Sequence, residues 1–306
     1  MPARRRRKAL RLKKTKPNKK IIYFFLFSFC LLVFLFTALK PKNWNGEDKV
    51  SLVIKNSDQS ISVVVFDPLL KEIYNIRIDP NTEIEVAGEY GKWKIKSIWQ
   101  LGEQEGMGGE LLSRSITLGL RMPVYLWADN VASGLVEPLS SNLLSSFFSR
   151  YKSNLSLGDK FKFLVFSLKV KNTNRVNINL ENTSYLERKV LISGDEGFIV
   201  AQNPPESISA IFADPALSSK IFRVAIKDGS EKPGLAEELG KVIEVLGGKV
   251  SSIEKIQKLD GTCMLESNEV AALRTLEKIF DCETTRSEVG NFDLEVSLGK
   301  DFAKMY

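Results

Sequence analysis

The chain has 306 residues, of which 43% are hydrophobic and 26% charged, the balance of an ordinary globular protein of about two domains. It contains no histidine and only three cysteines, which excludes Ser-His and Cys-His nucleophilic sites, histidine-ligated metals and zinc sites with four cysteine ligands. The net charge of +7 is unevenly distributed: residues 1–20 carry eleven Lys or Arg and no acid, and the remaining chain has 33 basic against 37 acidic residues. The body is therefore weakly acidic, and we expect no nucleic-acid partner for it.

Residues 21–39 read IIYFFLFSFCLLVFLFTAL, a run of 19 residues without a charge. As a helix this run would be about 28 Å long, close to the ~30 Å hydrocarbon core of a bilayer. Because the basic tail of residues 1–20 precedes it, the sequence predicts a single-pass cell-membrane protein with a cytoplasmic N-terminus and residues 40–306 extracytoplasmic. A cleaved signal peptide and a lipoprotein site at Cys30 fit less well, since the run is long and lacks the small residues that both need.

Beyond the predicted span, a polar stalk at residues 40–49 leads into a first domain, residues 50–202. Its residues 60–66, SISVVVF, are continuous enough to predict a buried central strand, whereas four glycines predict a loop at residues 102–109. Residues 161–170 fit either a helix or a strand. The other predicted elements are strands at 51–55, 73–78, 82–87, 124–128, 176–180, 189–192 and 198–201, and helices at 108–120 and 140–151.

Residues 203–219 contain three prolines and predict a linker to a second domain, residues 220–306. In this second domain the apolar residues recur with helical period at 234–246 and at 269–280, and they alternate with polar residues at 293–298. Strands are also predicted at 221–227, 249–256 and 262–265. The predicted order is β-α-β-β-α-β, a split βαβ plan.

The second domain resembles the LytR C-terminal domain of bacterial cell-envelope proteins. The resemblance runs from residue 221 to residue 302 and includes both ends of that domain. It rests on an Asp-Gly turn, a Gly-Leu-Ala helix start and a final strand followed by a Gly-x-Asp turn. The matching residues are Asp228, Gly229, Gly234, Leu235, Ala236, Asp293, Gly299 and Asp301.

The first domain is similar to the catalytic domain of LytR-CpsA-Psr (LCP) proteins, through ISVVVFDPLLKEIYNIRIDPNTEIEV and GGELLSRSITLGLRMPVYLWAD. Active members of that family are phosphotransferases, which move a glycan polymer from a polyprenyl-pyrophosphate carrier to the cell wall. The resemblance implies an acid-bound Mg²⁺ and several arginines that neutralise the pyrophosphate. The resulting fold class is α/β (α+β): an N-terminal transmembrane helix, a degenerate LCP-like mixed-sheet domain and the small C-terminal domain.

The arginines that this chemistry needs are mostly missing here. The family's Pro-Arg-Asp-Thr stretch falls on Asp79-Pro80-Asn81-Thr82, and its arginine-rich segment has no counterpart. We therefore expect no catalysis, no cofactor and no metal, and the predicted function is to bind or scaffold an envelope protein or glycan. The alternative is a divergent phosphotransferase that uses Mg²⁺. Its site would be formed by Asp58, Arg77, Asp79, Arg114 and Arg121.

Cys263 and Cys282 are 19 positions apart, one in a predicted strand and the other just past the helix that follows. A strand–helix return can bring such residues together, and an oxidising exterior favours a disulfide. Two buried thiols are the alternative, and the sequence does not decide between them. No histidine is present to activate either thiol, so we expect neither cysteine to be a nucleophile.

Overall fold

The computed structural model describes residues 40–137, 140–201 and 203–306. The predicted span at residues 21–39 and its basic tail lie outside them. Among the described residues, no helix is long and apolar enough to cross a membrane. Residues 41–306 form one compact unit. Its described residues form three sheets, each of which combines parallel and antiparallel pairings in a mixed α/β fold.

The first sheet has the strand order β6-β1-β2-β3-β7. β1–β2 and β2–β3 are antiparallel hairpins, whereas β6 and β7 add parallel to the two edges. Every residue of β2 is buried, as its continuous apolar run predicts. The strands are β1 (Val50–Lys55), β2 (Ile61–Asp67), β3 (Glu72–Ile78), β6 (Leu126–Ala128) and β7 (Arg175–Asn179).

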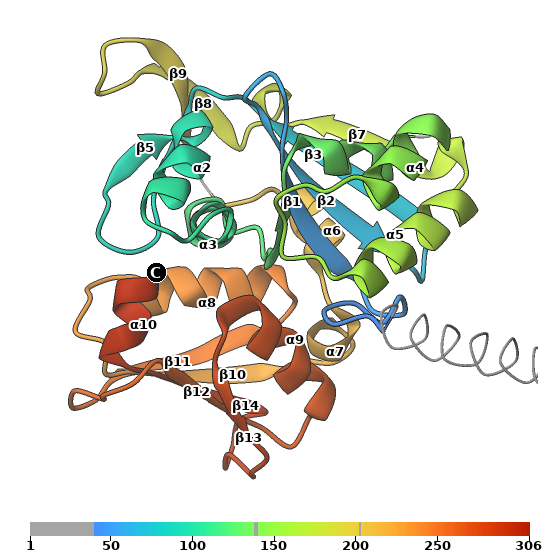
Figure 1. The fold of residues 1–306 in the computed structure, drawn as a ribbon. Coiled ribbons are helices and arrows are strands. Elements are labelled where there is room, and N and C mark those ends of the chain that lie inside the picture. The colour runs from blue at the N-terminus through green and yellow to red at the C-terminus, as the bar shows by residue number, and fades with distance from the viewer. Residues whose placement is uncertain (1–39, 138–139, 202) are drawn as a thin grey trace, which may run out of the picture. The chain divides into compact units, whose positions relative to one another are not determined.

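Helices cover both faces of this sheet (Figure 1). Val53, Val63 and Ile76 point to the face with α2 and α3, and Leu52, Val64 and Ile73 point to the face with α4 and α5. This alternation follows from the two-residue period of a strand. The helices are α2 (Ile95–Gln104), α3 (Glu110–Gly119), α4 (Ser140–Phe148) and α5 (Leu157–Lys169), with the 3₁₀ turns η1 (Asn130–Leu135), η2 (Asn172–Asn174) and η3 (Leu180–Asn182).

Two of these helices correct or complete the sequence prediction. The first residues of the predicted loop at 102–109 belong to α2. Gly102 is a glycine because of a close approach within the fold, since a Cβ there would lie 2.1 Å from the Gly108 carbonyl oxygen. The ambiguous residues 161–170 belong to α5. Its N-terminus is fixed by a capping box between Ser156 and Asp159, which selects the helix over a strand.

A second, smaller sheet has the order β5-β4-β9-β8 and ends in the β8–β9 hairpin at the upper left of Figure 1. Its strands are β4 (Thr82–Glu85), β5 (Lys92–Lys94), β8 (Leu186–Val190) and β9 (Glu196–Val200). The segment predicted as a linker then forms two short helices, α6 (Glu206–Phe212) and α7 (Pro215–Ser218). Phe212 and Leu217 are buried in the main core, so this segment is packed.

The third sheet, of order β11-β10-β14-β12-β13, contains the strands of the predicted second domain. The predicted β-α-β-β-α-β order is present, with one more strand, β13, before the last and one more helix, α10, after it. Its apolar residues continue the core of the first sheet's α2–α3 face. The elements are β10 (Arg223–Asp228), α8 (Leu235–Val245), β11 (Lys249–Lys255), β12 (Cys263–Glu266), α9 (Val270–Phe280), β13 (Glu283–Thr285), β14 (Leu294–Leu298) and α10 (Lys300–Met305).

Candidate functional site

A polar groove lies on the face of the first sheet that also carries α4 and α5. Towards one end of this face, the outward positions of the strands are apolar and buried beneath the helices: Leu52, Val64 and Phe66. Towards the other end, the same rows continue as polar side chains. We define the polar groove by Asn56, Ser62, Asn75, Arg77, Glu137, Arg175 and Asn177.

Strand register brings these side chains side by side. Asn75 on β3 pairs with Asn177 on β7, and Ser62 on β2 pairs with Arg77. The Asn75 side-chain amide donates to Asn177 Oδ1 at 3.0 Å, and the Asn56 amide donates to the Ser62 hydroxyl at 3.0 Å. The groove encloses a cavity of about 330 Å³. This volume falls within the roughly 300–1,000 Å³ range of small-molecule sites.

Two polar atoms in the groove have no hydrogen-bond partner among the described residues, Asn75 Oδ1 and Arg175 Nε. The rest of the Arg175 guanidinium is used by the fold: it donates to the carbonyl oxygens of Val136 and Ser167, both at 2.6 Å. Burial lowers the pKa of Arg175. A buried acceptor and donor without partners are costly, which makes this the part of the sheet best suited to a hydrogen-bonding ligand.

Arg77 and Asp58, two residues of the predicted catalytic set, do meet at the rim of the groove. They form an ion pair, with about half of each side chain exposed. A hydrogen bond from the Ser60 hydroxyl is the main reason that the pKa of Asp58 lies below its ordinary value, and the Arg77 charge adds to it. The pair is therefore a charged, accessible edge of the groove at neutral pH.

The other three predicted catalytic residues have structural partners elsewhere. Asp79 accepts a hydrogen bond from the Asn81 backbone at 2.7 Å and forms the turn after β3. Arg114 pairs with Glu110 at 2.5 Å on α3. Arg121 pairs with Glu238 of α8 at 3.1 Å and also donates to Asn203. The fold thus pairs only one of the three arginines, Arg77, with a carboxylate of the predicted set.

The residues that carry the LytR C-terminal resemblance form turns and helix ends. Asp228 accepts from the Ser230 backbone and hydroxyl, Gly234 has φ +82 before α8, and Leu235 and Ala236 are buried on that helix. Asp293 accepts from the Arg223 backbone at 2.8 Å, and the Asp301 backbone amide donates to Gly261. At Gly229 and Gly299 a Cβ would approach Leu259 and Gly261 to 2.9 and 2.3 Å, respectively. These residues build the domain, and none contributes to the groove.

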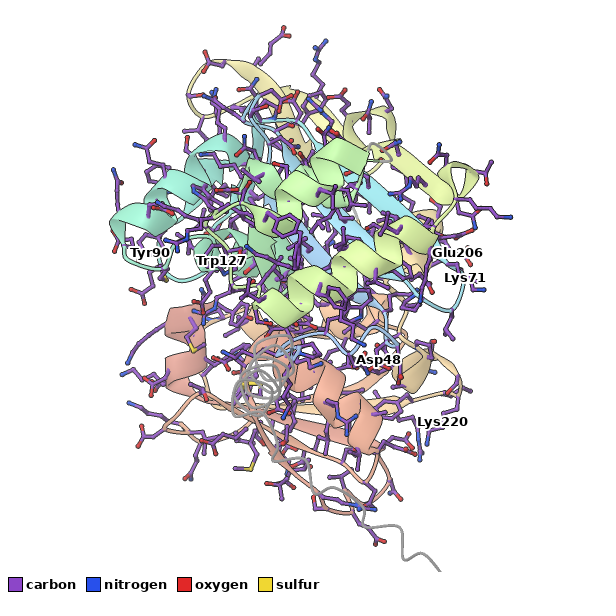
Figure 2. The ribbon with its side chains drawn as sticks, turned by 45° about the vertical axis from the view of Figure 1, so that its right-hand side comes forward. Asp48, Lys71, Tyr90, Trp127, Glu206 and Lys220 are labelled. Carbon is purple, nitrogen blue, oxygen red and sulfur yellow. A yellow bond between two sulfur atoms is a disulfide. The ribbon has the colours of Figure 1, made fainter. Side chains whose placement is uncertain are left out.

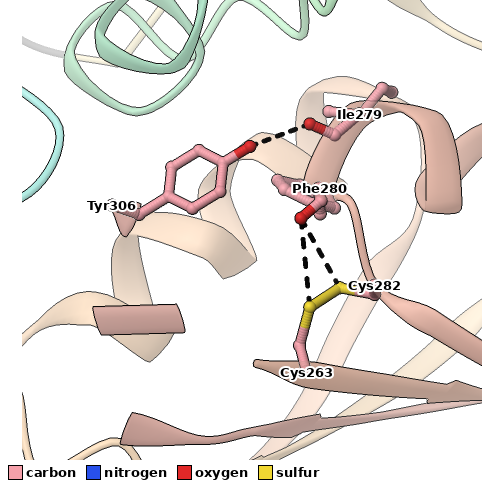
Figure 3. Close-up of a disulfide and its surroundings, with 5 residues drawn as sticks. All are labelled: Cys263, Ile279, Phe280, Cys282 and Tyr306. Atoms are coloured by element: carbon pink, nitrogen blue, oxygen red, sulfur yellow. Dashed lines mark hydrogen bonds between the residues drawn. A yellow bond between two sulfur atoms is a disulfide. The ribbon is translucent and has the colours of Figure 1, made fainter. Parts of the chain in front are cut away.

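Cys263 and Cys282 are joined by a disulfide with a Cα–Cα distance of 4.9 Å (Figure 3). It links β12 to the chain that leaves α9, beside the buried residue Phe280. Of the two states that the sequence left open, a disulfide and two buried thiols, the structure contains the disulfide. Within the described residues, no three His, Cys, Asp or Glu side chains are grouped to hold a metal ion.

A second cavity, of about 400 Å³, lies between the stalk and α7 and α9. Its walls are largely apolar, with Trp44, Val65, Phe212 and Ile279 among them. Two of the cations at its edge are used by the fold, since Lys49 pairs with Asp67 at 3.1 Å and Lys278 donates to the Asn43 carbonyl at 2.9 Å. We therefore regard the polar groove as the better candidate site.

Apart from Arg77, the residues that define the groove were not predicted from the sequence, although a signal was present. Within apolar strands, Ser62, Asn75 and Asn177 occupy the outward positions of a two-residue alternation. Asn75 and Asn177 are 102 positions apart, so their pairing depends on β7 adding beside β3. Only the sheet topology brings them into one site.

No protein-family model and no curated protein matches the sequence. Among solved structures, the chain is similar to TagT of B. subtilis, with 15% identity and a TM-score of 0.38 over 56% of this chain and 92% of that one. It is similar to the LytR-CPS2A-psr family protein YwtF (TagT) with bound octaprenyl pyrophosphate lipid, with 15% identity and a TM-score of 0.39 over 56% and 91%. Lin1025 of Listeria innocua matches at 12% identity and a TM-score of 0.37 over 54% and 95%. A resemblance to LytR-CPS2A-psr proteins is thus found both in the sequence and among solved structures, over about half of this chain.

Proposed function

We propose that this chain is a membrane-anchored, extracytoplasmic cell-envelope protein of the LytR-CpsA-Psr group that binds a hydroxyl-rich envelope glycan without transferring it. The observation that carries this proposal is the row of amide, hydroxyl and guanidinium groups that runs from Asn56, just after β1, across β2, β3 and β7. Each amide offers both a donor and an acceptor, which matches a sugar hydroxyl that is itself both. Asn75 Oδ1 and Arg175 Nε would gain partners from such a ligand.

The charge of the groove favours a neutral glycan over a polyanion. Arg77 is paired with Asp58, and Glu137 lies in the same groove as Arg175. Arg175 is moreover held by backbone carbonyls. Two cations matched by two acids leave no net positive charge to attract a phosphate-rich polymer.

The same geometry supports the absence of transfer. Phosphoryl transfer needs several cations at the charge that develops on the transferred group. Arg114 and Arg121 are held by Glu110 and Glu238, away from Arg77. One exposed arginine that is already paired is a poor pyrophosphate clamp.

Binding is tested by titrating soluble neutral cell-wall glycan fragments into the protein and measuring heat or tryptophan fluorescence. We expect saturable binding, which Asn75→Ala/Asn177→Ala weakens by at least tenfold because it removes the central amide pair. Arg114→Ala is the matched control, since it removes a polar side chain away from the groove, and it should bind as the wild type does. Equal binding by all three proteins would place the glycan elsewhere.

Transfer is tested with LIIa-WTA, a ligand bound in a solved structure of TagT, as the donor and a peptidoglycan fragment as the acceptor. We expect no Mg²⁺-dependent transfer of the polymer, with one phosphate, from the pyrophosphate to an acceptor hydroxyl by this chain. Turnover that requires Mg²⁺ and is lost in Arg77→Ala would overturn the proposal and support the divergent phosphotransferase.

The predicted membrane anchor is tested by measuring the orientation of the chain in the membrane. Deleting residues 1–16 removes most of the cations before the predicted span, so the fraction of chains with an extracytoplasmic C-terminus should fall. Protease accessibility of residues 40–306 in intact cells measures this fraction. An unchanged orientation, or recovery of the full chain in the soluble fraction, would contradict the predicted anchor.

A further inference from the structure

Helices α4 and α5, which lie on the right-hand side in Figure 1, carry several exposed apolar side chains. Figure 2 turns these two helices towards the viewer. We define the α4–α5 surface by five large apolar side chains that are 39–76% exposed. They are Leu144, Phe148, Leu157, Phe161 and Leu168.

This surface is distinct from the face with which α5 contacts the core. Phe163 is fully buried, and its ring stacks on Trp44 with ring centroids 4.5 Å apart. Leu157, Phe161 and Leu168 recur at i, i+4 and i+11, on the side of the helix away from Phe163. Phe147 joins the two helices by contacting Phe161, with centroids 6.2 Å apart. An apolar surface of this kind, left uncovered, marks an interaction site.

The exposed charges of the segment that forms this surface are basic, although the carboxylates of Glu137 and Glu103 contact Asn142 and Lys152 from outside it. Residues 142–171 contain six basic residues and one acid, Asp159. Asp159 and Lys160 are both buried, so the charges at the surface of this segment are basic. They are Arg150, Lys152, Lys162, Lys169 and Lys171, of which Lys152 also contacts Glu103. Apolar side chains flanked by cations are the signature of a segment that lies in the headgroup region of an anionic bilayer.

The chain also enters the described unit at the first turn of α5. The backbone amides of Lys42, Asn43 and Trp44 donate to Asp159 Oδ1 at 3.1, 2.9 and 3.0 Å. Residue 39, the end of the predicted span, is three residues before Lys42, so a fully extended chain separates them by only about 10 Å. If residues 21–39 span the bilayer, the point where the chain meets the first turn of α5 lies within that reach of it.

We propose that the α4–α5 surface lies in the interface of the same bilayer and holds the folded unit flat against anionic lipid. This inference rests on the proposed anchorage for its geometry, but it does not depend on the ligand of the polar groove. The α5 helix ends at Lys169, and the Arg175 side chain reaches back to its last carbonyls. The polar groove would therefore open close to the membrane surface.

The test uses the full chain in vesicles of phosphatidylcholine with 30% phosphatidylglycerol. A polarity-sensitive fluorophore is attached at position 161 through Phe161→Cys, in a Cys30→Ser background. The matched control carries the fluorophore at Ile192 through Ile192→Cys, since Ile192 is 83% exposed but lies on the β8–β9 hairpin. We expect nitroxide-labelled lipid to quench the label at position 161 at least twofold more than the label at position 192. Equal quenching at the two positions would overturn the proposal.

A second measurement separates failure of the surface from failure of the anchor. The fragment of residues 41–306, which forms one compact unit with its own core, is sedimented with vesicles. We expect more binding to anionic than to neutral vesicles, and at least a tenfold loss in Leu157→Ser/Leu168→Ser. Val190→Ser/Ile192→Ser removes two comparably exposed apolar side chains and should bind as the wild type does. Weaker vesicle binding by both double variants, or no binding to either vesicle, would refute the proposed membrane contact. A dimer in solution that buries the α4–α5 surface would also refute it.

Discussion

Asp159 is a buried carboxylate that organises the point where the chain enters the folded unit. It caps α5 together with Ser156, and it accepts hydrogen bonds from three consecutive backbone amides of the stalk. No part of its side chain is exposed. Because each of these donors would lose a charged partner, the residue contributes more than an ordinary helix cap.

We predict that Asp159→Ala lowers the free energy of unfolding by about 2–4 kcal/mol. Chemical denaturation of residues 41–306 measures this value. Asp195→Ala is the control, since Asp195 is largely exposed and pairs only with Lys94 and Ser193, and it should change stability by less than about 0.5 kcal/mol. Similar losses in the two variants would show that the stalk is not held in this way.

Asp214 is a second buried carboxylate, and its environment is unfavourable to its charge. Burial raises the pKa of Asp214 above the ordinary 3.8, although hydrogen bonds from the Ala216 backbone and the Thr275 hydroxyl act in the opposite direction. The folded state therefore binds a proton more readily than the unfolded state does. The contribution of Asp214 to the free energy of unfolding therefore falls as pH rises from its ordinary pKa of 3.8 through its raised pKa in the folded state.

We predict that Asp214→Asn is more stable than the wild type at pH 7.5, because it keeps the Oδ1 acceptor for Ala216 and removes the buried charge. The gain should shrink as pH falls from the raised pKa of the folded state to about the ordinary 3.8, below which the wild-type carboxyl is protonated in both states. Thermal unfolding at pH 7.5 and at pH 3.5 makes the comparison. A difference in Tm that is the same at both values would contradict the raised pKa.

At the scale of the element, the disulfide joins β12 to the end of α9. It closes a loop of about 20 residues, for which the chain-entropy estimate is ~3 kcal/mol. We predict that Cys263→Ala/Cys282→Ala lowers the free energy of unfolding by about that amount. Reducing agent should destabilise the wild type equally and leave the double variant unchanged. A wild type that is insensitive to reductant would show that the bond does not contribute.

The first and third sheets share one core at the scale of the whole molecule. The apolar cluster that contains Val63 of β2 also contains Leu239 of α8 and Val296 of β14. Arg121, which follows α3, pairs with Glu238 of α8, and Lys278 of α9 donates to Asn43 of the stalk. Elements so connected are expected to unfold together.

We predict a single unfolding transition for residues 41–306, monitored at once by tryptophan fluorescence and by far-UV circular dichroism. All four tryptophans, at 44, 93, 99 and 127, precede the third sheet, and three of them, at 93, 99 and 127, report on the part of the chain before that sheet. Leu239→Ala on α8 should cost about 2–4 kcal/mol and shift both signals together. A shift in circular dichroism that leaves the fluorescence transition in place would show two independent domains.

Periodicity in the sequence was enough to predict most strands, the α8 and α9 helices and the order of elements around the third sheet. Val242 and Ile243 on α8, and Leu294, Val296 and Leu298 on β14, carry patterns that depend on local geometry alone. The absence of histidine and the scattered arginines are properties of the sequence itself. They argue against histidine-dependent sites and against an arginine cluster that binds pyrophosphate.

The tertiary structure determines which side chains face each other. Asn75 and Asn177 face each other only because β7 adds parallel to β3, and Arg121 is paired only because α3 lies against α8. A side chain's own sequence neighbours determine its secondary structure and its face, which is why the elements were predictable. Its partners come from segments a hundred residues away, so the polar groove and the α4–α5 surface exist only once the strands and helices are assembled.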